Sequence, residues 1–390
     1  MARRVQPDLE FIKGIQKAGG TTLKKCYQCA TCAVVCPLSP DEGPFPRKEM
    51  IWAQWGLKDK LATDPAVWLC HQCGDCSAYC PRGAKPGDVL GAIRAMAIRH
   101  YASPKALWTM FNEPGYLPFL FAVAFAIIIG VMVAYHGGFE IPEGPVRYSE
   151  GFWHGFMPVV LVDAIFLPLV GLVALFSARG VINLWKDLCQ SQGISPKLKP
   201  SAGEFLDLYV WPTIGEILQH TRFQKCGATK ERATGHMMVL WAFIILFVVT
   251  NIVFIGADFL GFHTPWKIYN PVKILANVGA VLLIVGIFMI LSMRREKTSQ
   301  GILQSSYNDW LLIWLIVTVG LSGLGAELLR LANIKFLAYP VYLLHLASVF
   351  VLFLSLPFSK FAHLLYRTTV MVFERYSNAQ KAAAASGEGQ

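Results

Sequence analysis

Residues 26–37, CYQCATCAVVCP, and residues 70–81, CHQCGDCSAYCP, share one spacing of four cysteines followed by a proline. In such a run three thiolates bind three corners of a 4Fe–4S cubane, and the fourth ligates the neighbouring cluster. Structural zinc sites use C-x2-C pairs separated by a longer loop, so zinc fits this spacing poorly. The sequence therefore predicts two 4Fe–4S clusters that exchange one ligand. Cluster 1 would take Cys26, Cys29, Cys32 and Cys80, and cluster 2 would take Cys70, Cys73, Cys76 and Cys36.

Both runs lie in a mixed polar and apolar region, residues 1–116, that we expect to form an α-helical two-cluster ferredoxin domain. The pattern predicts helices between the runs and over residues 90–101, and no strand. Clustered cysteines favour a reducing compartment, and MARRVQPDLE lacks the apolar core of a signal peptide. We expect Cys189 and Cys226 to be unligated and His71 to lie at the surface.

Six apolar segments follow, each long enough to cross the hydrocarbon core of a bilayer. Only 15% of all residues are charged, and the mean hydropathy of +0.45 is too high for an ordinary soluble protein. The segments are residues 117–135, 154–176, 236–256, 272–291, 309–329 and 339–357. We therefore predict an all-α chain with a six-helix transmembrane domain at 117–370 and a tail at 371–390 that ends in disorder.

The basic residues of the membrane part gather in the loop 177–235, in the loop after the fourth segment, and in the tail. The positive-inside rule then places both termini and the cluster domain in the cytoplasm, at the cytoplasmic (inner) membrane. The net charge of +10 reflects this topology and not nucleic-acid binding, because no basic stripe forms. Residues 203–220 look amphipathic, as a helix on the membrane surface or against a partner would be.

Histidines at the ends of the segments suggest b-type haem, because a histidine in a span is costly unless it has a use. His345 and His363 would face the same way on one continuous helix, with a rise of about 27 Å between them. The topology then pairs His236 with His363 at the inner side and His154 with His345 at the outer side. Two stacked haems would connect the two sides of the membrane.

Several alternatives stay open in the membrane part. His220 can replace His236, and His136 or His263 can replace His154; any of these histidines can also be merely interfacial. Asp163 lies inside the second segment. An intramembrane carboxylate suggests a proton route or a quinone contact, and a hydrogen bond between helices is its structural alternative.

The cysteine runs and their helical spacer resemble the small iron–sulfur subunit of heterodisulfide reductases. Residues 343–367, LLHLASVFVLFLSLPFSKFAHLLYR, resemble the final helix of the haem-b membrane subunits of nitrate reductases and heterodisulfide reductases. This resemblance implies that His345 and His363 bind haem, with His236 as the inner partner. The other partner of that family would fall near Leu246, where no histidine stands, so His154 is our substitute.

The fusion of both modules is similar to the C subunits of quinone-interacting membrane-bound oxidoreductase complexes of sulfate reducers. That resemblance implies electron transfer between menaquinone and soluble flavin and iron–sulfur subunits, and exchange with adenylylsulfate reductase. A related protein serving sulfite reduction, heterodisulfide reduction or methanogenic electron transfer is the main alternative. A complete disulfide reductase would need an adjacent cysteine pair, which this chain lacks. A transporter with a ferredoxin-like regulatory domain would show no haem spectrum.

Overall fold

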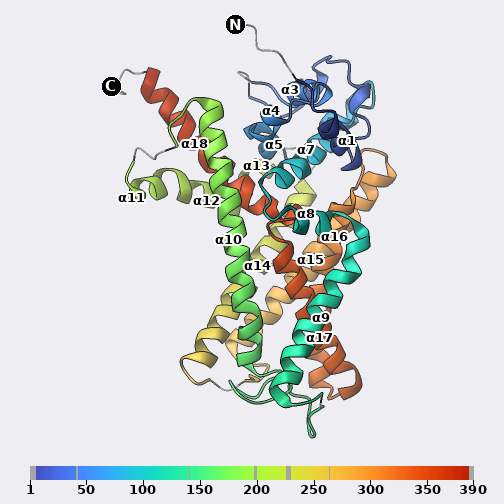
Figure 1. Ribbon diagram of the computed structural model, residues 1–390, viewed down its shortest axis with the longest axis vertical. Helices are drawn as coiled ribbons and strands as arrows, with labels where there is room; N and C mark the ends of the chain where they lie inside the picture. The colour runs from blue at the N-terminus through green and yellow to red at the C-terminus, as the bar shows by residue number, and fades with distance from the viewer. Residues whose placement is uncertain are drawn as a thin grey trace.

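The computed structural model describes residues 6–40, 43–139, 141–196, 200–224, 230–262 and 264–385. Over these ranges the regular structure is helical, with no strand and a single isolated bridge between Glu150 and His154. Figure 1 shows short helices gathered at one end of a bundle of long helices. The predicted all-α class is confirmed.

The short helices form the cluster domain, which is organised around one central helix. These helices are α1 (Leu9–Lys17), α2 (Thr31–Val34), α3 (Arg47–Gln54), α4 (Lys58–Ala62), α5 (Pro65–Leu69), α6 (Asp75–Ala78), α7 (Pro86–Tyr101) and α8 (Lys105–Asn112). α7 begins with Pro86, whose missing N–H is harmless at the first helical position. Helices α1, α3, α4, α5 and α6 pack on it and bury Leu90 and Ile93 completely. This packing fixes the loops that carry the cysteines.

Six long apolar helices form the membrane bundle, which confirms the predicted number of spans among the described residues. They are α9 (Leu117–His136), α10 (Val159–Gln192), α14 (Lys230–Asp258), α15 (Pro271–Ser299), α16 (Tyr307–Leu331) and α17 (Lys335–Ser355). α16 and α17 are the most buried of the six. α14 and α15 approach closely through small residues, and a Cβ atom on Gly286 would lie 2.8 Å from the carbonyl oxygen of Gly235.

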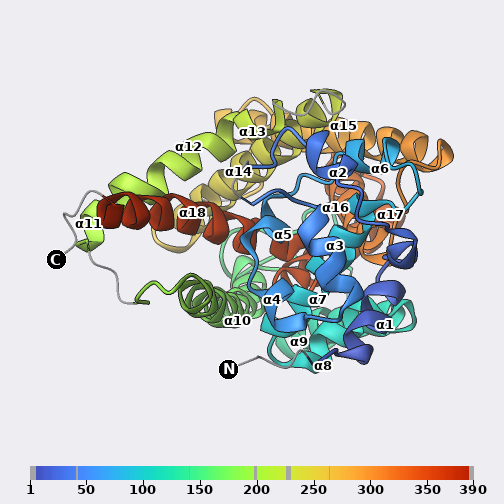
Figure 2. The ribbon, with the colours of Figure 1, turned by 90° about the horizontal axis from the view of Figure 1, so that it is seen from above.

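Additional helices extend the bundle on the side of the cluster domain. α10 continues to Gln192, well past the predicted end of the second span at residue 176. The amphipathic stretch forms α11 (Ala202–Phe205), a π-helical turn over residues 206–210 and α12 (Trp211–Gln219), followed by α13 (Thr221–Gln224). The last helix, α18 (His363–Ala385), packs on α10 and α5. Figure 2 shows α11, α12 and α18 beside the cluster domain.

The predicted continuous helix through His345 and His363 is wrong. α17 ends at Ser355, a turn carries Pro357, and α18 begins only at His363. Proline disfavours helical backbone at the preceding residue, and the side chain of Ser359 caps the short turn that follows. His345 therefore belongs to a membrane span, whereas His363 starts a helix that runs past the cluster domain.

Candidate cofactor sites

The two cysteine runs adopt the same local backbone. Gln28 and Ala30 in the first run have positive φ angles of 61° and 69°, and Gln72 and Gly74 at the equivalent positions have φ angles of 51° and 96°. Non-glycine residues rarely adopt this conformation. In each run the tight curl is followed by a helix of a single turn, α2 or α6, and these two helices pack together.

The structure brings the cysteines into the two predicted sets. Burial raises the pKa of Cys32 to about 12, and the neighbouring thiols of Cys26, Cys29 and Cys80 raise it further. Burial likewise raises the pKa of Cys36 to about 11, with a contribution from the thiols of the second run. One cavity is lined by all four sulfur-bearing residues of the second set: Cys36, Cys70, Cys73 and Cys76. Eight thiols in two sets of four are the donors that two 4Fe–4S clusters need.

A group of cations surrounds the loop of the second run, and we call it the cationic collar. Arg94 and Arg367 donate to the carbonyl of Cys70 over 3.1 and 3.4 Å, and Lys297 donates to the carbonyl of Cys73 over 3.0 Å. Arg232 donates to the carbonyl of Gln72 over 2.8 Å. The collar comprises Arg94 of α7, Arg232 of α14, Lys297 of α15 and Arg367 of α18. Cations this close fit a cluster that four thiolates make negative.

His71 lies in the centre of the collar, so the expectation of a surface position is wrong. It is 6% exposed, its carbonyl accepts from Arg232, and its Nε2 lies 2.7 Å from the guanidinium of Arg367. Its ring meets the ring of Phe223 edge-on, with centroids 4.4 Å apart. Phe223 in turn stacks on His236 with centroids 5.4 Å apart. Aromatic contact therefore runs from the second cysteine loop to a predicted haem ligand.

His236 and His363 come together as predicted for the side of the cluster domain. Their ring centroids lie 6.3 Å apart, and this separation leaves space for a metal with bonds of about 2 Å to each ring. Nδ1 of His363 lies 2.7 Å from the carbonyl of Lys360, and Nδ1 of His236 lies 2.8 Å from Nε2 of His220. Partners at Nδ1 orient a ring and leave Nε2 as the ligand. His220 thus supports His236 in place of replacing it.

The second predicted pair is not assembled in the structure. Nδ1 of His345 lies 3.1 Å from the carbonyl of Val319, and a Cβ atom on Gly323 would lie 2.8 Å from the His345 ring. His345 is therefore held with Nε2 available. His154 is exposed in the loop before α10, where its carbonyl accepts from the N–H of Glu150. The alternative His136 is exposed at the end of α9, and His263 and Cys226 lie outside the described residues.

Asp163 is half-buried on α10, and its carboxyl group interacts with that of Asp258, at the end of α14. One oxygen of each carboxylate has no hydrogen-bond partner among the described residues. Sequence reasoning did not single out Asp258, although it is an acidic residue at the edge of an apolar segment. The two acids form a pair on the side of the bundle away from the clusters.

Two family models match different parts of the chain. Residues 22–84 match the 4Fe-4S dicluster domain. The two-cluster prediction is thereby confirmed. Residues 219–385 match Citrate utilization protein B, a family that sequence analysis did not anticipate. No solved structure matches the chain.

Curated relatives fall into the same two groups. Citrate utilization protein B of Escherichia coli is 25% identical over 286 residues, which are 71% of each chain. The C subunit of the H(2):CoB-CoM heterodisulfide,ferredoxin reductase of Methanothermobacter thermautotrophicus is 40% identical over 98 residues, 25% of this chain and 52% of the relative. A protein of Archaeoglobus profundus that is named for its likeness to the C subunit of heterodisulfide reductase is 35% identical over 105 residues, 26% of this chain and 56% of the relative. The chain spans about half the length of these two reductase relatives.

The cluster domain is therefore that of an iron–sulfur electron-transfer protein related to the C subunit of heterodisulfide reductase. This agrees with the resemblance found in the cysteine runs. The ligand assignments, the haems and the link to quinone stay predictions.

Proposed function

We propose that this chain is the membrane subunit of an oxidoreductase complex and moves electrons between menaquinone and soluble flavin and iron–sulfur subunits. The observation that carries the proposal is the contact between the second cysteine loop and the histidine pair, through His71 and Phe223. It joins a site suited to a 4Fe–4S cluster to a site suited to haem. The sequence resemblance suggests sulfate respiration, with adenylylsulfate reductase as the final partner.

The chain's residues have separate tasks in this proposal. His236 and His363 hold one haem near the clusters, and His345 and His154 hold the other on the far side. The outer pairing rests on sequence alone, because His154 lies in an exposed loop. When bound, haem and 4Fe–4S clusters gain and lose single electrons. The collar holds the second cysteine loop against the bundle, and Asp163 with Asp258 handles protons on the far side.

The first cysteine run supplies the face toward a soluble partner. Cys29 is exposed, and so are the side chains of Tyr27, Val34 and Tyr79 around it. Arg82 covers the ring of Tyr27, with its guanidinium carbon 4.0 Å from the ring centroid. An apolar rim with basic residues favours a partner whose docking surface is acidic. Cluster 1 would be the terminal cluster, with both chain termini and this face in the cytoplasm at the inner membrane.

An optical and chemical analysis of the purified protein tests the proposal. We expect a reduced-minus-oxidised spectrum of b-type haem at about two haems per chain, with about eight non-haem irons from two 4Fe–4S clusters. One haem per chain would mean that His154 and His345 do not form a site. Intact iron without haem would refute the quinone-linked function and leave a cluster domain on a membrane anchor.

The long match to Citrate utilization protein B favours a second candidate. It covers much more of the chain than the matches to the reductase relatives do, and it includes the membrane bundle. In this case the cluster domain would accept electrons from a soluble enzyme of carboxylate utilisation and deliver them to quinone. Co-purification decides between the candidates, because the soluble subunits that accompany the chain would differ.

A further inference from the structure

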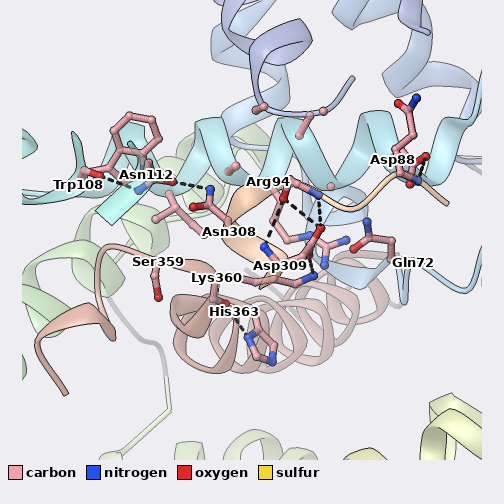
Figure 3. Close-up of a pocket in the computed structure, with 18 of the residues that line it drawn as sticks. Gln72, Asp88, Arg94, Trp108, Asn112, Asn308, Asp309, Ser359, Lys360 and His363 are labelled. Atoms are coloured by element: carbon pink, nitrogen blue, oxygen red, sulfur yellow. Dashed lines mark hydrogen bonds and ion pairs between the residues drawn. The ribbon is translucent and has the colours of Figure 1, made fainter. Parts of the chain in front are cut away.

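A polar cavity lies where the cluster domain rests on the bundle. It is lined by α7 and α8, the start of α16, and the turn before α18, and His363 is part of its wall. Gln72, from the second cysteine run, lines the same cavity. The cavity therefore borders both a predicted haem ligand and the loop of cluster 2. Figure 3 shows Asn112 and Asn308 at one end of this cavity and Asp88 at the other.

Each end of the cavity carries a hydrogen-bond acceptor without a partner. Asp88 is 3% exposed; its Oδ2 accepts from the N–H of Gln304 over 2.9 Å, but its Oδ1 has no partner among the described residues. Asn308 donates to Oδ1 of Asn112 over 2.5 Å, and its own Oδ1 is equally unpaired among the residues described. Unsatisfied buried acceptors are costly, so they favour a ligand that brings O–H donors.

The wall between these ends suits an aromatic ring that comes from the membrane. Trp108, Phe358 and Ile98 contribute apolar surface to the cavity. Trp108 belongs to α8, a short helix beside the first span that packs on both the cluster domain and the bundle. Ligand sites commonly combine an apolar lining with a few polar groups that fix orientation.

We propose that this cavity binds the head group of menaquinol, with one hydroxyl at Asn308 and the other at Asp88. This inference rests on the proposed function and places its quinone reaction on the cluster side of the bundle. Quinol oxidation yields quinone, two protons and two electrons. Asp88 accepts one proton and the second leaves through solvent. The electrons leave singly to the haem iron that His363 and His236 would hold, which is the oxidant.

The surroundings of Asp88 support its role as proton acceptor. Burial raises the pKa of Asp88 to about 6, and Asp309 adds to this shift. The N–H of Gln304 and the cations Lys85 and Arg294 oppose it. Asp309 is itself balanced by Arg294 and Lys360. Asp88 is therefore ionised at neutral pH and gains a proton more easily than an exposed carboxylate.

Two substitutions test the site in the purified holoprotein. Asp88→Asn keeps the shape but removes the proton acceptor, and Asn308→Leu removes the acceptor at the other end. The matched controls are Asp59→Asn on α4 and Asn251→Leu on α14; the side-chain amide of Asn251 bonds to the carbonyl of Phe247. The probes are menadiol, which drives haem reduction in a stopped-flow instrument, and the quinol analogue 2-heptyl-4-hydroxyquinoline N-oxide, which reports binding.

We expect both cavity variants to slow haem reduction by menadiol about tenfold, on the scale of one lost hydrogen bond. The analogue should bind more weakly to Asn308→Leu, and dithionite should still reduce the haem fully in every variant. Wild-type rates and binding in both variants would overturn the site while leaving the proposed function intact. A wild-type haem that menadiol cannot reduce would refute the proposed function itself. An Asn308→Leu protein that does not fold leaves Asp88→Asn as the test.

Discussion

The guanidinium of Arg367 contacts both the carbonyl of Cys70 and the ring of His71. Burial, together with the nearby cations Arg94, Arg222 and Arg232, lowers the pKa of Arg367 to about 9, so it is still charged near neutral pH. A positive charge here stabilises the reduced, more negative cluster. We expect Arg367→Gln to lower the midpoint potential of cluster 2 by roughly 60 mV, equivalent to about 1.4 kcal/mol for one electron.

A redox titration monitored by electron paramagnetic resonance measures this shift. Arg82→Gln is the matched control, because Arg82 lies over Tyr27 in the first cysteine run. That substitution should leave the potential of cluster 2 unchanged. An unaltered cluster 2 potential in Arg367→Gln would mean that the collar only fastens the cluster domain to the bundle.

The ring of Phe223 fills the space between His71 and His236. Phe223→Ala would open a gap there, and electron transfer weakens when packed atoms are removed from between two carriers. We expect the rate from haem to cluster 2 to fall several-fold at unchanged midpoint potentials, measured by flash photolysis. Phe223→Tyr keeps the ring and should retain the rate. Equal rates in the alanine and tyrosine variants would exclude Phe223 from the electron route.

Asp163 and Asp258 bring two carboxyl groups together on the far side of the bundle. If this pair carries a proton released by quinol, Asp163→Asn should slow quinol oxidation severalfold, with haem content unchanged. The measurement is steady-state oxidation of menadiol beside a haem assay of the same sample. Unaltered turnover would reduce the pair to a contact between helices.

At the level of the helices, α16 and α17 meet at a glycine that His345 requires. A Cβ atom on Gly323 would lie 2.8 Å from Cε1 of His345, so Gly323→Ala must displace the ring. Overpacking of this kind costs about 1–3 kcal/mol. We expect a shifted or lost signal from the outer haem while the inner haem is retained, as seen in the optical spectrum. Gly171→Ala on α10 is the control, because its Cβ would meet nothing within 4 Å. An unchanged outer signal would exclude His345 as a ligand.

The helices themselves were largely predictable, because span length and hydropathy are local properties of the sequence. The six spans were expected and are present, but the start of α10 and the break after α17 were not. Both errors lie at prolines: Pro158 precedes α10, and Pro357 follows α17. An apolar run does not reveal which proline ends a helix, so the two histidines of residues 343–367 were wrongly placed on one helix.

For the whole molecule, predictability depended on how far apart in the sequence the interacting residues lie. The ligand sets follow from the spacing within two short runs, and the structure groups the thiols in the same way. The collar joins Arg232 and Arg367 to a loop 160 and 298 positions away in the chain, and no local pattern encodes such contacts. His71 was misjudged for this reason, since its burial comes from helices that the sequence does not place.

The arrangement of the whole chain also predicts its topology. Six spans return the chain to the side on which it started, and α18 packs directly on α5 of the cluster domain. The C-terminal helix and the clusters must then share one side, which the basic loops identify as the cytoplasm. A green fluorescent protein fused to the C-terminus should fluoresce, and an alkaline phosphatase fused there should be inactive. The same phosphatase fused after Gly137, beyond the first span, should be active. An active C-terminal phosphatase would invert the bundle and place the cluster domain outside, where its soluble partners could not reach it.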